Sequence, residues 1–378
     1  MMGRPTVAEV DLGALRFNVK QVRQFTKGQA EILAVVKADA YGHGAVPVAR
    51  ELYSAGVRIF GVASVEEGVE LRQCGVSLPI LVLGGTHGRE PEEVIQNGLT
   101  PVLFDLDTAR ALDAEAGKAQ KYVPVHVKID TGMNRLGVPW REWGQAMNLF
   151  RSLKNLRVEG LMSHLSAAES EQPGDQAFTE EQIGRFQVCL DHAREVGIQP
   201  RYVHLANSAA LVLWERALFN LVRPGLMLYG VHPSAALQGR LPLRPAMCWK
   251  TEILFLKRVP AGDPVSYGRT YSCERDALIA TLPVGYADGY SRRLSNRAEV
   301  LIRGRRAKVV GVVCMDLAMV DVSEIPGVHV GDEAVLLGKQ ESEEISASEM
   351  AKWAGTIPYE VLCAIGKRVP RRYLKGEF

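Results

Sequence analysis

The stretch AVVKADAYGHG, residues 34–44, determines how the first half of the chain is organised. It continues a run of apolar and β-branched residues that ends at Val36 and is typical of a strand buried on both faces. Lys37 follows directly, and Gly42 and Gly44 then interrupt the chain. The sequence therefore predicts a buried strand whose end carries a lysine, followed by a glycine-containing turn.

Similar apolar runs recur along the first two thirds of the chain. They are ILAVVK, RIFGVA, PILVLG, TPVLF, VPVHVKI, VEGLMS, YVHLA and LVRPGLMLYG. Segments of helical pattern lie between them, and FTEEQIGRFQVCLDHAREVG (178–197) is the clearest. About eight strand–helix units over about 220 residues is the arithmetic of a (β/α)8 barrel. A doubly wound sheet would use fewer strands, and no GxGxxG turn follows the first strand.

The pattern changes after Pro233, where SAALQGRLPLRP is rich in turn-forming residues and indicates a linker. Beyond it, short strands alternate with tight turns, which indicates a small β barrel or sandwich. We therefore predict two domains: a (β/α)8 barrel over residues 8–235 and a mostly β domain over residues 236–378, with which residues 1–7 could pack.

The composition excludes several other classes of protein. The 378 residues are 47% hydrophobic and 23% charged, which is typical of a globular chain with a large core. A net charge of +2 gives no reason to expect nucleic acid as a partner. The six cysteines show no CxxC spacing, so we expect no metal and a reduced, cytoplasmic setting. No apolar segment reaches the ~18 residues of a membrane span, and the first residues lack the apolar run of a secretory signal.

Polar residues follow several of the predicted strands, at the end where barrels of this type place their chemistry. Partial burial of Lys37 would lower its pKa and favour a nucleophilic amine. A lysine that simply reaches solvent from a strand end explains the same position equally well. The other polar residues at strand ends are Lys128, Asp130, Arg135, His164, Asn207, Ser208 and Arg223.

Taken together, these residues indicate a particular kind of binding site, which none of them indicates alone. His164 alone could be a buried core histidine, and Asn207 a helix N-cap. However, the loops after the seventh and eighth strands of such barrels commonly hold phosphate on backbone N–H groups. A reactive lysine together with a phosphate site indicates pyridoxal 5'-phosphate (PLP) as the cofactor.

Seven segments resemble motifs of the alanine racemase family, in the same order along almost the whole chain. They are AVVKADAYGHG, KIDTGMNRLG, ANSAA, VRPGLMLYG, VSYGRTY, LPVGYADGY and GVVCMD. The resemblance implies a PLP-binding barrel followed by a β domain. It also implies an isomerase that interconverts L-alanine and D-alanine, supplying D-alanine for the peptidoglycan of the cell wall.

The resemblance further implies a two-base mechanism, because racemisation removes the α-proton on one face and returns a proton on the other. Lys37 would carry the cofactor and act as one base, and Tyr267 of VSYGRTY would be the opposing base. A tyrosine is a poor base at its reference pKa of about 10, and His164 matches the histidine that assists it in the family. Without the resemblance, Tyr267 would be interpreted as a packing residue of the β domain.

Arg223 matches the residue that faces the pyridine nitrogen of the cofactor. An arginine keeps its own proton, so the nitrogen stays uncharged and the ring is a weaker electron sink. This favours return of a proton to the α-carbon over transamination. The alternative for Arg223 is a salt bridge at the rim of the barrel.

The remaining site residues also follow from the resemblance. Arg135 and the backbone of Met315 would bind the substrate. Lys128 matches a lysine that many members carry as a carbamate, which could orient Arg135; an ordinary ion pair with Asp130 is the alternative. The phosphate would be bound by Tyr41, Ser208, Gly225, Leu226 and Tyr359, with Asn207 nearby.

By the same analogy the active form is a head-to-tail homodimer, in which Tyr267 and Met315 reach the barrel of the partner. Tyr286, Asp288 and Arg292 of GYADGYSRR would line the corridor through which substrate arrives.

Three other functions remain as alternatives. A PLP-dependent decarboxylase would have an acidic partner for the ring nitrogen and an HxGS turn, against which Arg223 and HLSAAE argue. A non-catalytic PLP carrier would not need the motifs of the β domain. A racemase of broad specificity often carries an export signal. The first residues of this sequence lack the apolar run of such a signal, so alanine is the favoured substrate.

Overall fold

The computed structural model describes residues 4–86 and 91–375. The chain divides into two compact units. The barrel unit comprises Leu15–Ala40 and Ala45–Leu243, and the β unit comprises Met1–Ala14, Tyr41–Gly44 and Arg244–Phe378. Among the described residues, no helix has both the length and the apolar character that crossing a bilayer requires.

Eight parallel strands form the barrel, and each overlaps one of the runs predicted from the sequence. Their order is β10-β2-β3-β4-β5-β6-β8-β9, and a parallel bridge between Asn207 and Arg223 links β9 back to β10. The backbone N–H of Arg223 also donates to Ala206 O at 3.0 Å. The predicted (β/α)8 barrel is confirmed. The strands are β2 (Glu31–Val35), β3 (Ile59–Val62), β4 (Ile80–Val82), β5 (Thr100–Leu103), β6 (Val123–Asp130), β8 (Leu156–Met162), β9 (Tyr202–His204) and β10 (Leu221–Val222), with the short β7 (Val138–Pro139) beside β6.

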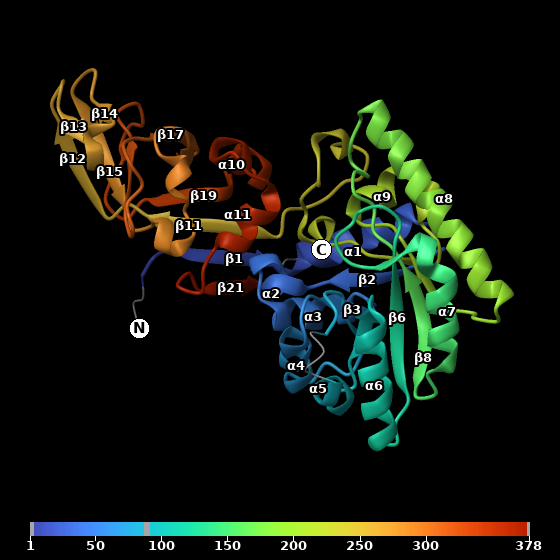
Figure 1. Ribbon diagram of the computed structural model, residues 1–378. Helices are drawn as coiled ribbons and strands as arrows, with labels where there is room; N and C mark the ends of the chain where they lie inside the picture. Colours follow the sequence, from blue (N-terminus) through green and yellow to red (C-terminus); the bar gives the residue numbers. More distant parts are fainter. Residues whose placement is uncertain (1–3, 87–90, 376–378) are drawn as a thin grey trace. The chain divides into compact units, whose positions relative to one another are not determined.

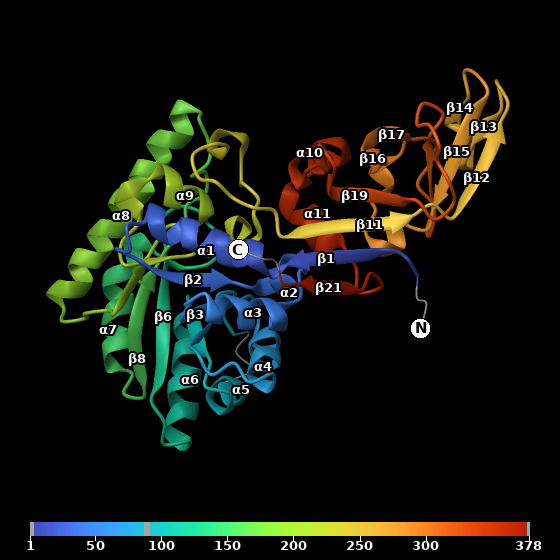
Figure 2. The same cartoon turned by 180° about the vertical axis from the view of Figure 1, so that it is seen from behind.

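Helices cover the outside of the barrel, and Figures 1 and 2 show α6 and α7 flanking β6 and β8. The predicted long helix is α8, which begins at Pro173, earlier than the sequence indicated, because proline is well suited to the first helical position. The helices are α1 (Leu12–Phe25), α3 (Ala45–Ser54), α4 (Val65–Gln73), α5 (Pro91–Gln96), α6 (Leu106–Lys118), α7 (Trp143–Ser152), α8 (Pro173–Glu195), α9 (Ser208–Leu213) and the 3-10 turn η3 (Leu226–Tyr229).

The segment after β2 is a left-handed turn, α2 (Lys37–Gly42), which the sequence did not predict. Four consecutive non-glycine residues, 38–41, have φ between +52° and +54°. L-residues avoid this region because Cβ approaches the following carbonyl oxygen. Glu67 of α4 supports the turn, since its carboxylate accepts from Ala38 N and from Ala63 N, both at 2.7 Å. The exits of β2 and β3 are thereby joined through one side chain.

The β unit is mostly β, as the sequence predicted, and it is built on one large sheet. The strand order is β12-β15-β18-β17-β16-β19-β11-β1-β21, with β20 beside β19 and a separate hairpin, β13-β14. These strands are β1 (Val7–Asp11), β11 (Met247–Glu252), β12 (Phe255–Val259), β13 (Pro264–Val265), β14 (Tyr271–Ser272), β15 (Ala277–Leu282), β16 (Glu299–Ile302), β17 (Arg305–Val309), β18 (Ala318–Asp321), β19 (Glu333–Gln340), β20 (Glu343–Ile345) and β21 (Arg371–Leu374).

The N-terminal strand β1 lies inside this sheet, antiparallel to β11 and parallel to β21. Two helices, α10 (Ala347–Ala354) and α11 (Pro358–Ala364), complete the unit. Gly44 is needed where the chain meets β21, because a Cβ there would lie 1.9 Å from the hydroxyl oxygen of Tyr373. The second glycine of AVVKADAYGHG thus allows a close approach as well as a turn.

Candidate active site

Arg223, which follows β10, is the centre of a polar cluster inside the barrel. Its side chain is 5% exposed. Nη2 donates to the carbonyl oxygens of Ser163 (2.8 Å) and Leu205 (2.9 Å) and to Nδ1 of His164 (3.2 Å). Nη1 donates to the carbonyl oxygen (2.8 Å) and Nδ1 (3.1 Å) of His204. Among the described residues, no carboxylate contacts this guanidinium and no acceptor binds its Nε.

Burial lowers the pKa of Arg223 to about 9, so the side chain remains charged at pH 7. All its acceptors are carbonyl oxygens or imidazole nitrogens, which carry no formal charge. The barrel therefore holds a buried positive charge that is well hydrogen-bonded but not neutralised.

Two further histidines, His204 and His126, extend the hydrogen-bonded cluster from Arg223. Nδ1 of His204 accepts from the arginine, so the proton of this ring lies on Nε2, which donates to Nδ1 of His126 at 2.7 Å. Burial lowers the pKa of His126 to about 3, with a smaller contribution from Arg223, and burial likewise holds the pKa of His204 well below its usual range. Both rings are neutral at pH 7. Nε2 of His126 is buried and has no partner among the described residues.

His126 and His204 were not predicted as members of this cluster. A signal was present, because each is a polar residue inside an apolar strand run, where an unpaired polar group would be costly. His126 also precedes Lys128 by two residues, so both side chains project from the same side of β6.

His164 is held next to Arg223 by contacts on both its ring and its backbone. Its carbonyl oxygen accepts from Gln182 Nε2 at 3.2 Å. Burial, followed by the charge of Arg223 and of other nearby cations, holds the pKa of His164 well below its usual range. Because Nδ1 accepts from the arginine, the single proton of this neutral ring lies on Nε2.

Four cations lie close enough to influence one another here: Lys37, Lys128, Arg135 and Arg223. Asp130 is the one carboxylate that acts on Lys128 in this group. Lys37 and Arg135 are exposed, whereas Lys128 and Arg223 are buried. Four positively charged side chains therefore gather at the carboxyl edge of the barrel.

Lys128 is the least expected of these cations, since its side chain is 5% exposed. Burial, followed by the charges of Arg135 and Arg223, lowers the pKa of Lys128 to about 8. Its Nζ forms no hydrogen bond or ion pair with any residue the structure describes. Asp130 instead accepts from Gly132 N (2.9 Å) and Asn134 N (3.1 Å). The ion pair between Lys128 and Asp130, one alternative from the sequence, is not formed.

The loops after β9 and β10 are joined by Ser208, whose Oγ accepts from Gly225 N at 3.0 Å. Asn207 is the N-cap of α9, and its Oδ1 accepts from Ala210 N at 2.9 Å. Leu226 is fully buried at the start of η3. Because Ser208 Oγ accepts one hydrogen bond, its own hydroxyl proton is available to a ligand.

In the β unit, Tyr267 and Met315 are 72% and 54% exposed. Tyr267 begins the turn η5 (Tyr267–Arg269) directly after Ser266, which has a φ of +68°. Ser266 Oγ donates to Val312 O at 2.6 Å and lies 3.6 Å from Cys314 Sγ. The loop of Tyr267 is thereby tied to the loop of Met315, and both side chains remain more than half exposed.

Tyr41 and Tyr359, both predicted to bind phosphate, are neighbours in the β unit with ring centroids 5.9 Å apart. Tyr286 and Arg292 are exposed. Asp288 is different: its side chain is fully buried and paired with Arg4. The expectation that Asp288 lines the substrate corridor is therefore wrong, and its pairing with Arg4 was not predicted from the sequence.

Barrel enzymes place their chemistry at the carboxyl edge of the strands, and here that edge carries an uncompensated positive charge. The barrel unit thus has the character of an enzyme that works on, or with, an anionic small molecule. Comparison with known proteins makes this specific. Residues 10–233 match the sequence model of the alanine racemase N-terminal domain, and residues 246–373 match that of the alanine racemase C-terminal domain.

Individual relatives agree. The alanine racemase of Geobacter sulfurreducens is 48% identical over 99% of this chain and 98% of its own length. The structure of alanine racemase from Clostridium difficile 630 has a TM-score of 0.93 at 38% identity, covering 99% of this chain and 97% of that one. The structure of the Bartonella henselae enzyme with covalently bound pyridoxal phosphate has a TM-score of 0.87 at 30% identity, covering 98% and 100% of the two chains.

The chain belongs to the alanine racemase family, and it is an alanine racemase in activity, an isomerase.

Proposed function

We propose that the chain interconverts L-alanine and D-alanine by a two-base mechanism with PLP held at the carboxyl edge of the barrel. The observation that carries the proposal is Arg223, a buried guanidinium with neutral acceptors and one N–H left over. When bound, PLP withdraws electrons from the α-carbon of the substrate and so makes its proton removable.

The residues present suit such a cofactor and an amino-acid substrate. Lys37, Lys128, Arg135 and Arg223 lie near one another at this edge, and a phosphate together with a substrate carboxylate would offset their mutual repulsion. The hydroxyl of Ser208 has a proton to donate to a phosphate oxygen. Leu226 opens η3, where backbone N–H groups lack partners within the helix. The N–H of Gly225 is already used by Ser208, so Gly225 contributes through its backbone position.

Arg223 favours racemisation over side reactions. The guanidinium keeps its proton, so a ring nitrogen that accepts a hydrogen bond from Nε remains unprotonated. Electron withdrawal from the α-carbon is then moderate, and the proton returns to that carbon. Asn207, as the N-cap of α9, holds the adjoining loop in place. The predicted phosphate contacts of Tyr41 and Tyr359 stay predictions.

Lys37 and Tyr267 are the two proposed bases. Each removes or returns a proton on one face of the α-carbon. Arg135 and the backbone of Met315 bind the substrate. Tyr267 and Met315 are exposed on loops that Ser266 ties together, and we propose that a second copy of the chain covers them.

The carbamate predicted for Lys128 has physical support. A lysine of pKa about 8 has an appreciable fraction of neutral amine at pH 7 to 8, and a neutral amine can react with carbon dioxide. The resulting negative charge would lie beside Arg135 and Arg223 and would relieve their repulsion. We further propose that the enzyme acts in the cytoplasm and supplies D-alanine for peptidoglycan.

The test compares three variants of the PLP-loaded protein in deuterated water, following deuterium at the α-carbon of L-alanine. Lys37→Ala should abolish both cofactor absorbance and turnover, and Tyr267→Phe should slow proton removal from L-alanine by about 10³-fold with cofactor still bound. Tyr271→Phe, on β14 of the same hairpin, should change little. Unaltered exchange in Tyr267→Phe would refute the two-base assignment.

A mixing experiment tests the shared site. Lys37→Ala and Tyr267→Phe are each inactive alone, but a mixed dimer would contain one site with both residues intact. Random exchange of subunits should therefore restore about a quarter of the wild-type rate. If each chain completes its own site, mixing will restore no activity.

A further inference from the structure

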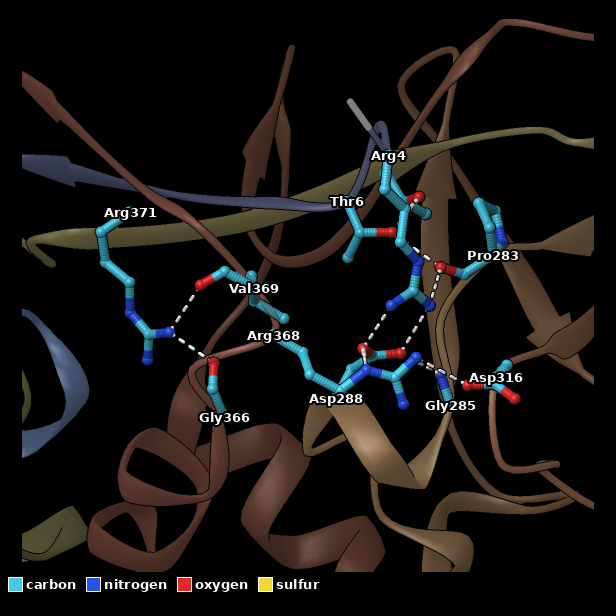
Figure 3. A network of polar contacts seen from close by, with 11 residues as sticks. Arg4, Thr6, Pro283, Gly285, Asp288, Asp316, Gly366, Arg368, Val369 and Arg371 are labelled. Atoms are coloured by element: carbon cyan, nitrogen blue, oxygen red, sulfur yellow. Dashed lines mark hydrogen bonds and ion pairs between the residues drawn. The ribbon is translucent and has the colours of Figure 1, made fainter. Parts of the chain in front are cut away.

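A chain of alternating charges runs through the β unit from the N-terminal segment to the loop of Met315 (Figure 3). Arg4 binds Asp288 with both terminal nitrogens, Nη1 to Oδ1 at 2.5 Å and Nη2 to Oδ2 at 2.7 Å. Arg368 Nε lies 3.6 Å from Asp288 Oδ1, and its Nη2 lies 2.8 Å from Asp316 Oδ1. The two members of the first pair are 284 residues apart in sequence.

Asp288 holds a turn in shape as well as binding the two arginines. Its Oδ2 accepts from Gly285 N at 3.0 Å, which closes the turn η6 (Tyr286–Asp288). Its backbone oxygen accepts from Gly366 N at 2.9 Å. The carboxylate is fully buried, so its position depends on these partners and not on water.

The turn η6 contacts the loop of Met315 directly. Tyr286 N donates to Cys314 O and Ala287 N donates to Met315 O, both at 3.1 Å. The two backbones approach so closely at Gly285 that a Cβ there would lie 2.3 Å from each of these carbonyl oxygens. The side chain of Met315 is 54% exposed, so the loop is held by these backbone bonds and by Asp316, in addition to the contacts of Ser266.

The N-terminal segment reaches the same region at a second point. Arg4 Nη2 donates to Pro283 O at 2.6 Å, and Thr6 Oγ1 donates to the same oxygen at 2.7 Å. Pro283 joins β15 to the turn η6. The guanidinium of Arg4 therefore binds both the segment that leads into the turn and the carboxylate at the end of the turn.

We propose that Arg4 is a positioning residue for the substrate site: through Asp288 it sets the turn η6, and the turn sets the backbone of Met315. This rests on the proposed role of Met315 in substrate binding. Arg4 acts through other residues, so its loss should weaken substrate binding more than it slows the chemical step.

The test compares Arg4→Met with Arg372→Met in the PLP-loaded enzyme. Arg372 is a matched control, because it is an exposed arginine on β21 paired with Glu9 at 3.4 Å, away from η6. Arg4→Met should raise the KM for L-alanine about tenfold with little change in kcat, which is the signature of binding shared by ground state and transition state. Arg372→Met should leave both unchanged, and Arg4→Lys should recover part of the loss.

Hydrogen exchange gives a readout independent of activity. Peptides covering residues 285–289 and 313–317 should exchange faster in Arg4→Met than in wild type, and those of the barrel unit should not. If Arg4→Met does not fold, Arg368→Met makes the same test from the exposed end of the charge chain, where its side chain is 49% exposed.

Wild-type KM and wild-type exchange in these peptides would overturn the proposal. A fall in kcat with unchanged KM would also overturn it, since the arginine would then act on the chemistry. Absence of alanine racemisation in the wild-type enzyme would instead refute the proposed function.

Discussion

Arg223 in the barrel unit and Asp288 in the β unit are both buried charges, but their surroundings differ. Asp288 is bound by Arg4 through two oxygens and has Arg368 beside it, so its charge is more than balanced. Arg223 is bound only by carbonyl oxygens and imidazole nitrogens, and other cations lie nearby. The β unit neutralises its buried charge, whereas the barrel unit leaves the charge of Arg223 without a carboxylate partner among the described residues.

The difference separates a positional role from a chemical one. A buried charge without a counter-charge is costly and is expected where function requires it. A buried ion pair can instead fix the arrangement of distant segments, as Asp288 does for the N-terminus and the turn η6. Changing each charge in turn tests whether this contrast is correct.

Replacement of Arg223 should have the largest effect. In Arg223→Glu an acidic group replaces the guanidinium and can share a proton with a ring nitrogen, so the cofactor withdraws electrons more strongly. Racemisation should fall by at least about 10³-fold, and pyruvate from transamination should rise relative to it. Both products are measured by coupled assays. Arg223→Lys keeps the positive charge and should form no extra pyruvate; equal pyruvate in the two variants would contradict the assigned role.

Removal of the carboxylate in Asp288→Ala should have the second largest effect. It leaves Arg4 and Arg368 beside a buried gap and frees the turn η6, which should lower the free energy of unfolding by about 3 kcal/mol. Urea denaturation measures the loss. Asp316→Ala, whose side chain is 53% exposed, should cost less than about 1 kcal/mol. Similar losses for the two variants would show that the buried pair contributes no more to the free energy of unfolding than the exposed pair does.

Lys128→Met should be stabilising, and the effect should depend on pH. The folded pKa is about 8, below the ordinary value of 10.5, so folding disfavours the protonated amine. This penalty is fully present below pH 8 and disappears as the pH rises toward 10.5. At pH 7, in buffer free of bicarbonate, the variant should therefore unfold with about 2 kcal/mol more free energy than wild type.

The contrast with wild type should vanish near pH 10.5. Lys20→Met, at an exposed position of α1, is the control for the loss of a lysine at the surface. Added bicarbonate should reduce the advantage of Lys128→Met if the wild-type lysine forms a carbamate. A constant difference across the pH range would mean that folding does not lower the pKa of this amine.

Much of the barrel could be predicted because each strand contains a local apolar run, and several of the predicted functional residues lie at or after the end of one. Lys37 and Arg223 lie where that pattern placed them, after β2 and β10. The pair of Arg4 and Asp288 could not be predicted, since nothing local links residues so far apart in sequence. The hydrogen bonds that join Arg223 to His204, and His204 to His126, were missed for the same reason: they join different strands.

The left-handed turn after β2 could not be predicted either, because its residues 38–41 include no glycine. The strain is held by tertiary contacts such as those of Glu67, and sequence propensity does not report such contacts. The same strain leads to the smallest of the predicted effects, a gain in the free energy of unfolding on substitution by glycine.

Ala38→Gly should stabilise the protein, although glycine normally weakens a helical position. Ala38 is exposed and has a φ of +52°, a conformation that costs an L-residue about 1 kcal/mol and glycine almost nothing. Ala114→Gly is the matched control, at an exposed position inside the right-handed helix α6, and should destabilise by about 1 kcal/mol. Chemical denaturation of both variants gives the two signs directly. If both substitutions destabilise, the turn after β2 stores no strain, and Lys37 owes its position to the strand alone.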